Sequence, residues 1–112
     1  MSSFSRSGTS MPTMCATPGQ FPPLKLTRVG DGFASPVLVT SSPGDANRLY
    51  VVQQFGLIRI LRPDGSIAPR PFLDVTSQVN IPFTNAEGGL LGLTFAPDYQ
   101  TSGRLFIHHS VK

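Results

Sequence analysis

The chain has 112 residues, 39% of them hydrophobic, which is enough for one domain with a modest core. Its net charge of +3 comes from nine Lys and Arg residues that are spread singly along the chain, which disfavours an electrostatic surface for nucleic acid. No apolar run has the length of a secretory signal or a membrane span, so neither kind of segment is visible in the printed sequence.

The first segment, residues 1–23, is rich in Ser, Thr, Pro and Gly and contains no carboxylate. Arg6 alone supplies too little positive charge for an organelle-transit peptide. The only cysteine, Cys15, lies here, which excludes an intramolecular disulfide and a cysteine-based metal cage. We expect residues 1–23 to be disordered or non-native and residues 24–112 to form the folded part.

Short strands joined by tight turns are expected from Leu24 onward, because eleven Gly and eleven Pro interrupt the chain too often for long helices. Tyr and Val enrichment and apolar alternation mark the strands, and clusters such as Pro63-Asp64-Gly65 mark the turns. The expected strands in this region are 24–29, 36–41, 48–53, 57–62 and 71–75.

A second copy of the same pattern begins at Leu90 and is the strongest signal in the chain. An apolar strand, a Pro-Asp turn and a further apolar strand at 104–109 repeat the arrangement around Pro43. Pro97 follows Pro43 by 54 residues and Arg104 follows Arg48 by 56, so the second copy has a loop two residues longer. Self-similarity of this kind predicts a repeat architecture.

Four antiparallel strands in a period of about 50 residues are typical of one blade of a β-propeller. We therefore predict an all-β chain that forms a partial β-propeller, with about one and a half four-stranded blades. Because a closed ring needs roughly four to eight blades, we expect the chain to be a fragment of a longer protein. The alternatives are association with other chains and a small open sheet whose exposed edges favour self-association.

Three segments carry a resemblance to a known family. They are 48–54 with Gly56, Pro71-Phe72-Leu73-Asp74, and Glu87-Gly88-Gly89-Leu90-Leu91-Gly92-Leu93 with Phe95, Pro97 and Asp98. They resemble the opening of the glucose/sorbosone dehydrogenase family, the soluble quinoprotein sugar dehydrogenases, and the propeller region of hedgehog-interacting proteins is similar. The resemblance implies a six-bladed ring that holds pyrroloquinoline quinone (PQQ) and calcium and oxidises an aldose to a lactone. It also implies a periplasmic or secreted location.

The same resemblance assigns no catalytic residue and no metal ligand to this chain, because the family's histidine base and calcium ligands come from later blades. PQQ and calcium are therefore not expected to bind this chain tightly. Glu87 is the one cofactor-binding candidate, since members place Gln or Glu in this loop near the cofactor and the sugar, whose hydroxyls a carboxylate can bind. Members often carry Arg where Gly88 stands and His where Ala96 stands.

The adjacent residues His108 and His109 are not interpreted as a metal site, because neighbouring side chains on a strand point to opposite faces. Four aspartates, Asp45, Asp64, Asp74 and Asp98, lie in or beside turns, where Asp bonds the local backbone.

Two functions are compatible with these observations. The first is a part of a PQQ-dependent sugar dehydrogenase that is inactive alone. The alternative is a non-catalytic, propeller-type binding module like that of the hedgehog-interacting proteins.

Overall fold

The computed structural model describes residues 2–3, 19, 21–80 and 87–111, and the chain divides into two compact units, Met1–Gly30 and Asp31–Lys112. In the first unit, β1 (Ser2–Ser3) pairs antiparallel with β2 (Thr27–Arg28). The strand predicted at 24–29 is therefore confirmed only over Thr27–Arg28. Cys15 and most of the segment predicted to be disordered lie outside the described residues.

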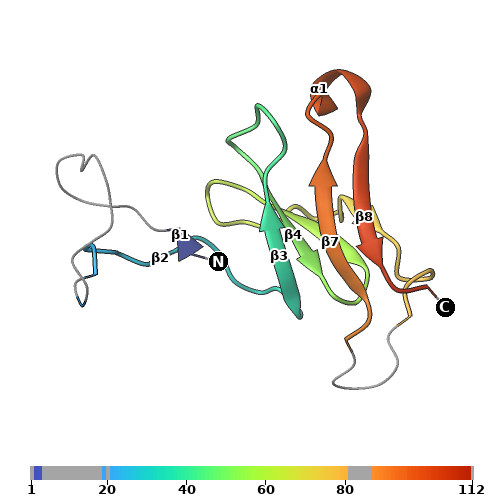
Figure 1. Cartoon of the computed structure of the whole chain (residues 1–112), viewed down its shortest axis with the longest axis horizontal. Coiled ribbons are helices and arrows are strands. Elements are labelled where there is room, and N and C mark those ends of the chain that lie inside the picture. Colours follow the sequence, from blue (N-terminus) through green and yellow to red (C-terminus); the bar gives the residue numbers. More distant parts are fainter. Residues whose placement is uncertain (1, 4–18, 20, 81–86, 112) are drawn as a thin grey trace. The chain divides into compact units, whose positions relative to one another are not determined.

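The second unit contains two antiparallel sheets (Figure 1). The first sheet has four strands in the order β3-β4-β5-β6, and the second has two, β7 and β8, connected through the short helix α1. The all-β class and the partial propeller of one and a half blades are thereby confirmed. The elements are β3 (Pro36–Thr40), β4 (Leu49–Gln53), β5 (Leu57–Leu61), β6 (Leu73–Asp74), β7 (Leu90–Phe95), α1 (Tyr99–Ser102) and β8 (Leu105–His109).

Differences between the predicted and observed bounds have local causes. β6 begins later than the predicted strand because Pro71 has no N–H to donate, and the next amide, that of Phe72, donates to the Ile58 carbonyl at 2.7 Å. The polar loop after Pro97 contains one helical turn, which ends when Gly103 adopts a left-handed φ of 66° and donates its N–H to the Tyr99 carbonyl.

The internal repeat is confirmed by the strand register. Val39 faces Val51 in the first sheet, and Leu93 faces Ile107 at the corresponding place in the second. Both pairs of strands carry a register shift at the same position, between Pro36 and Leu38 and between Leu90 and Gly92. The residue before each first strand has positive φ, 45° at Ser35 and 114° at Gly89.

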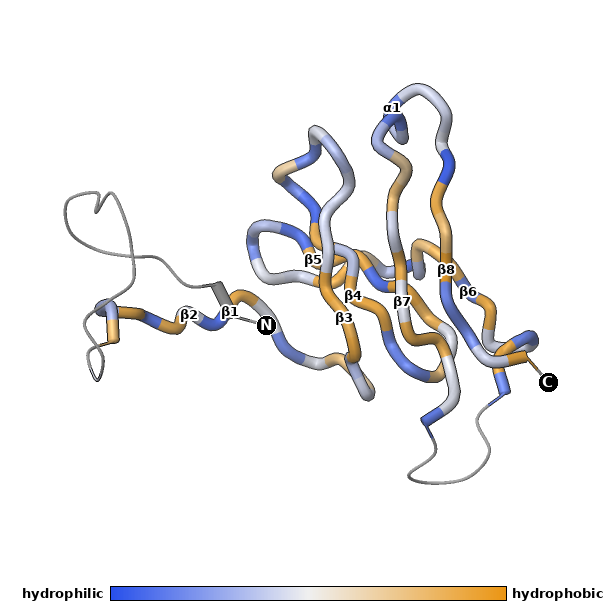
Figure 2. The backbone as a smooth tube through the Cα atoms, viewed as in Figure 1, coloured by the Kyte–Doolittle hydropathy of each residue, from blue (hydrophilic) through white to orange (hydrophobic). Residues whose placement is uncertain are grey.

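A shared hydrophobic core joins the two sheets, with β7 in contact with β3 and β4. Aromatic rings occupy its centre: Tyr50 lies 4.8 Å from both Phe72 and Phe95, and Phe95 lies 4.6 Å from Tyr99. Figure 2 shows the hydrophobic stretches along the strands and the mostly polar turns at their ends. The buried members are Tyr50, Val52, Ile58, Val75, Val79, Leu90, Leu93 and Phe95.

The two repeats differ in how much of the equivalent face is covered. Tyr50 on β4 is 1% exposed because the second sheet packs against it, whereas Phe106, its counterpart on β8, is 61% exposed. His108, the counterpart of the buried Val52, is exposed as well. The same face is therefore the core in the first sheet and a solvent-facing surface in the second.

Candidate functional site

The predicted cofactor-binding residue, Glu87, is exposed and precedes β7 by three positions. Its neighbours are held firmly: the Gly88 carbonyl accepts a bond of 2.8 Å from Gln54 Nε2, and the Gly89 amide donates one of 2.8 Å to Ser110 Oγ. Ser110 Oγ in turn donates to the Asn80 carbonyl at 2.6 Å. The structure thus anchors the backbone beside Glu87, while its role toward a cofactor stays a prediction.

The two histidines lie on β8 opposite different partners, His108 facing Gly92 and His109 facing Leu90 across the ladder. His109 Nδ1 lies 3.2 Å from the Ser110 carbonyl oxygen, which is a local contact. Among the described residues, no group of three His, Cys, Asp or Glu side chains gathers in a geometry suited to a metal ion.

A hollow of about 680 Å³ lies at the end of the sheets where the β3–β4 turn meets α1, and we call it the intersheet groove. In Figure 1 this turn and α1 lie at the same end of the unit. Gln100 Nε2 donates to the Pro43 carbonyl at 3.0 Å, which ties α1 to the turn of the other sheet. The groove is lined by Ser42, Pro43, Gly44, Asp45, Arg48, Tyr99, Gln100, Thr101, Ser102 and Gly103.

An ion pair stands in this groove, with Arg48 Nε donating to Asp45 Oδ2 at 2.5 Å. Asp45 also accepts from the Asn47 amide at 2.9 Å. The bond from Asn47 and then the Arg48 guanidinium hold the pKa of the Asp45 carboxyl below its ordinary value, and the bond to Asp45 raises the pKa of Arg48. At neutral pH both groups are therefore charged.

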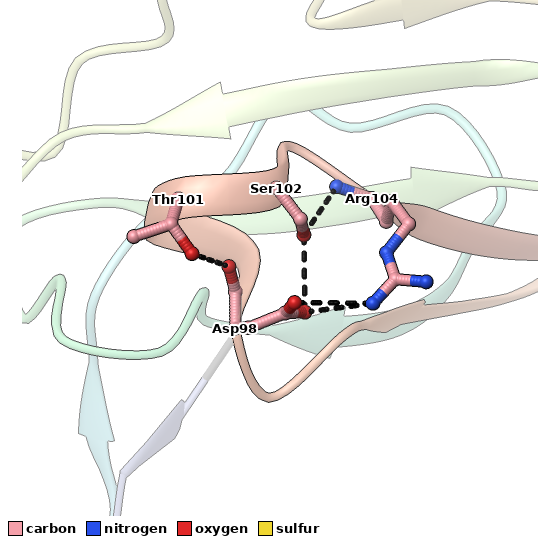
Figure 3. A network of polar contacts seen from close by, with 4 residues as sticks. All are labelled: Asp98, Thr101, Ser102 and Arg104. Atoms are coloured by element: carbon pink, nitrogen blue, oxygen red, sulfur yellow. Dashed lines mark hydrogen bonds and ion pairs between the residues drawn. The ribbon is translucent and has the colours of Figure 1, made fainter.

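The second repeat has a matching pair, Asp98 and Arg104, shown in Figure 3. Arg104 Nη2 lies 3.0 Å from Asp98 Oδ2, and Ser102 Oγ donates to Asp98 Oδ1 at 3.0 Å. Both aspartates are in or beside turns, as predicted, whereas their arginine partners were not predicted. The signal was present, because Arg48 and Arg104 occupy equivalent repeat positions just before a strand.

Replacing Asp45 with Asn is expected to lower the thermal unfolding midpoint slightly at pH 6.5, and this difference should shrink as the pH falls through the folded-state pKa of Asp45. The bonds from Asn47 and Arg48 hold the folded-state pKa of Asp45 below the ordinary value of 3.8. Its stabilising contribution is therefore complete above the unfolded-state pKa and is lost as the pH falls through the folded-state value. Thermal melts of both proteins followed by circular dichroism from pH 7 to pH 2.5 test this; a difference that grows on acidification contradicts it.

Comparison with known proteins shows similarity to hedgehog-interacting proteins. No family model matches the chain. It is 31% identical over 88 residues to Hedgehog-interacting protein of Mus musculus, which covers 78% of this chain and 13% of that protein. The Homo sapiens protein of the same name is 31% identical over 86 residues, 76% of this chain and 12% of its own length.

The chain therefore spans about an eighth of the length of these curated relatives. The comparisons support the hedgehog-interacting side of the expected resemblance, and nothing in them supports the sugar dehydrogenases specifically. Within the part of the chain that the structure describes, no helix has the length and apolar character needed to cross a membrane.

Proposed function

We propose that this chain contributes two sheets to a non-catalytic, propeller-type module that binds another protein. The observation that carries the proposal is the similarity to Hedgehog-interacting protein over most of the chain, on a fold of two repeated sheets. The relatives are named for an interaction with Hedgehog, and a protein ligand of that kind is the partner we assign to this chain.

The architecture supports a binding role. The buried aromatic core makes the sheets a rigid scaffold, and the polar segments that lie at the sheet ends are held by specific hydrogen bonds. Loops that a rigid scaffold positions in this way are the usual location of binding residues. An aldose substrate, PQQ with calcium, and self-association through the sheet edges stay predictions.

Saturable binding of a Hedgehog protein to the immobilised chain is the expected result in biolayer interferometry. A Glu87→Leu variant serves in a parallel assay with PQQ, calcium, aldoses and a dye acceptor, in which we expect no turnover from either protein. PQQ-dependent dye reduction by the parent chain that is lost in Glu87→Leu favours the dehydrogenase function instead. Absence of Hedgehog binding contradicts the proposed partner.

A further inference from the structure

We propose that the intersheet groove binds a carboxylate side chain of an acidic peptide segment, with Arg48 as the residue that binds it. This inference rests on the proposed function, because it states where and through which chemistry a partner protein contacts the module. It is carried by three features of the structure: a preformed hollow, an exposed guanidinium with donors to spare, and an anion that fixes this guanidinium in place.

The hollow is preformed because both of its walls are held. One wall is the β3–β4 turn, where Ser42 is 5% exposed and its carbonyl accepts from the Asp45 amide at 3.2 Å. The other wall is α1, which Tyr99 anchors to the core by packing on Phe95. The bond from Gln100 to the Pro43 carbonyl links the two walls directly. Gly44 permits this bond, because a Cβ at that position would overlap the Gln100 side-chain amide.

Arg48 presents an ordered cation to this hollow. Its side chain is 52% exposed, whereas that of Asp45 is only 17% exposed. A guanidinium carries five N–H donors, and the bond to Asp45 engages Nε. The outer Nη edge therefore stays available for a second, planar acceptor, and Asp45 reduces the rotational freedom that binding would otherwise have to remove.

A carboxylate fits this arrangement better than a sugar does. Guanidinium and carboxylate groups pair through parallel, charge-assisted hydrogen bonds, which are stronger than bonds between neutral groups. A sugar needs an accessible aromatic face to stack upon, and the aromatic ring in the groove, Tyr99, is half-buried and packs edge-on against Phe95 at 4.6 Å. The hydroxyl donors of Thr101 and Ser102 are already directed to Asp98.

The second repeat supplies a matched control. Arg104 occupies the position equivalent to Arg48 and forms the corresponding ion pair with Asp98. It is exposed, but its guanidinium is bonded to both carboxylate oxygens, at 3.3 and 3.0 Å from Nη2, and it does not line the groove. Loss of Arg104 removes one positive charge and one surface ion pair, as loss of Arg48 does, but at a side chain that does not line the groove.

The test is a titration of the ¹⁵N-labelled chain with a terminally blocked hexapeptide that contains three Glu residues. We expect amide shifts at Gly44, Asp45 and residues 100–103. Arg48→Gln should weaken peptide binding by about tenfold or more, Arg48→Lys by less, and Arg104→Gln by no more than about twofold. The amide spectrum of each variant in the absence of peptide verifies that it folds.

Three results overturn the inference: equal loss of affinity in Arg48→Gln and Arg104→Gln, equal binding of a hexapeptide with Gln in place of Glu, or the same amide shifts with a neutral oligosaccharide. The Hedgehog-binding measurement separates this inference from the proposed function. Peptide binding without Hedgehog binding supports the inference about the groove and contradicts the proposed partner. Hedgehog binding that Arg48→Gln leaves unchanged retains the function and places the contact elsewhere.

Discussion

Substitution of Tyr50 by Ala is expected to lower the free energy of unfolding by about 3–5 kcal/mol, the usual cost of removing a large aromatic ring from a core. Tyr50 is 1% exposed, and its ring lies 4.8 Å from that of Phe72, which precedes β6, and 4.8 Å from that of Phe95 in the other sheet. The deletion leaves a cavity at the junction of the two sheets. Because small domains have total stabilities of roughly 5–15 kcal/mol, we expect a large fraction of the variant to be unfolded.

The matched control is Phe106→Ala, which removes a ring of similar size from the equivalent position of the second repeat. Phe106 is 61% exposed, so its deletion should cost less than about 1 kcal/mol. Urea denaturation of the parent chain and the two variants measures the unfolding midpoint of each. Far-UV circular dichroism is the signal, because the chain has no Trp for fluorescence. Equal losses in the two variants would show that the sheets do not pack as described.

Local signals in the sequence were sufficient to predict the strands and the repeat. Pro43 and Pro97 mark the same turn, and Arg48 and Arg104 the same strand entry, because each turn needs fixed backbone angles and each strand an alternating apolar face. The observed register places Val39 and Leu93 at equivalent positions, as the offset requires. The observed strand ends differ from the predicted ones by up to three residues, and at β6 the cause is Pro71, which has no N–H for the ladder.

The intersheet groove had no comparable signal. It depends on the bond between Gln100 and Pro43, whose residues are 57 positions apart, and on one helical turn that replaces the expected loop. Neither follows from periodicity, because the approach of two turns is determined by how the sheets pack. Glu87 was predicted as a cofactor-binding residue from the resemblance alone. The bonds that anchor its neighbours come from Gln54 and Ser110, which no local sequence pattern connects to this segment.

Substitution of Gly89 by Ala is expected to destabilise the chain by about 3 kcal/mol or more, through strain and overlap combined. Gly89 has a φ of 114°, a conformation that residues with a side chain rarely adopt. A Cβ built there would lie 2.5 Å from the Gln54 carbonyl oxygen and 2.7 Å from Gln54 Cγ. To relieve this overlap the backbone at Gly89 must move away from Gln54. That movement weakens the bonds that the Gly88 carbonyl and the Leu90 amide form with Gln54.

Gly103→Ala isolates the conformational part of this effect. Gly103 also has a positive φ, 66°, but no atom lies within 4 Å of a Cβ built there, so the expected cost is about 1–2 kcal/mol. Urea denaturation measures both variants against the parent chain, and amide hydrogen exchange at Leu90 and Ser110 locates the change. Because the Leu90 amide donates to the Gln54 carbonyl at 2.8 Å, it should lose protection in Gly89→Ala and keep it in Gly103→Ala. Equal destabilisation by the two substitutions would mean that the close approach of Gly89 to Gln54 is absent, and with it the anchoring of the segment that carries Glu87.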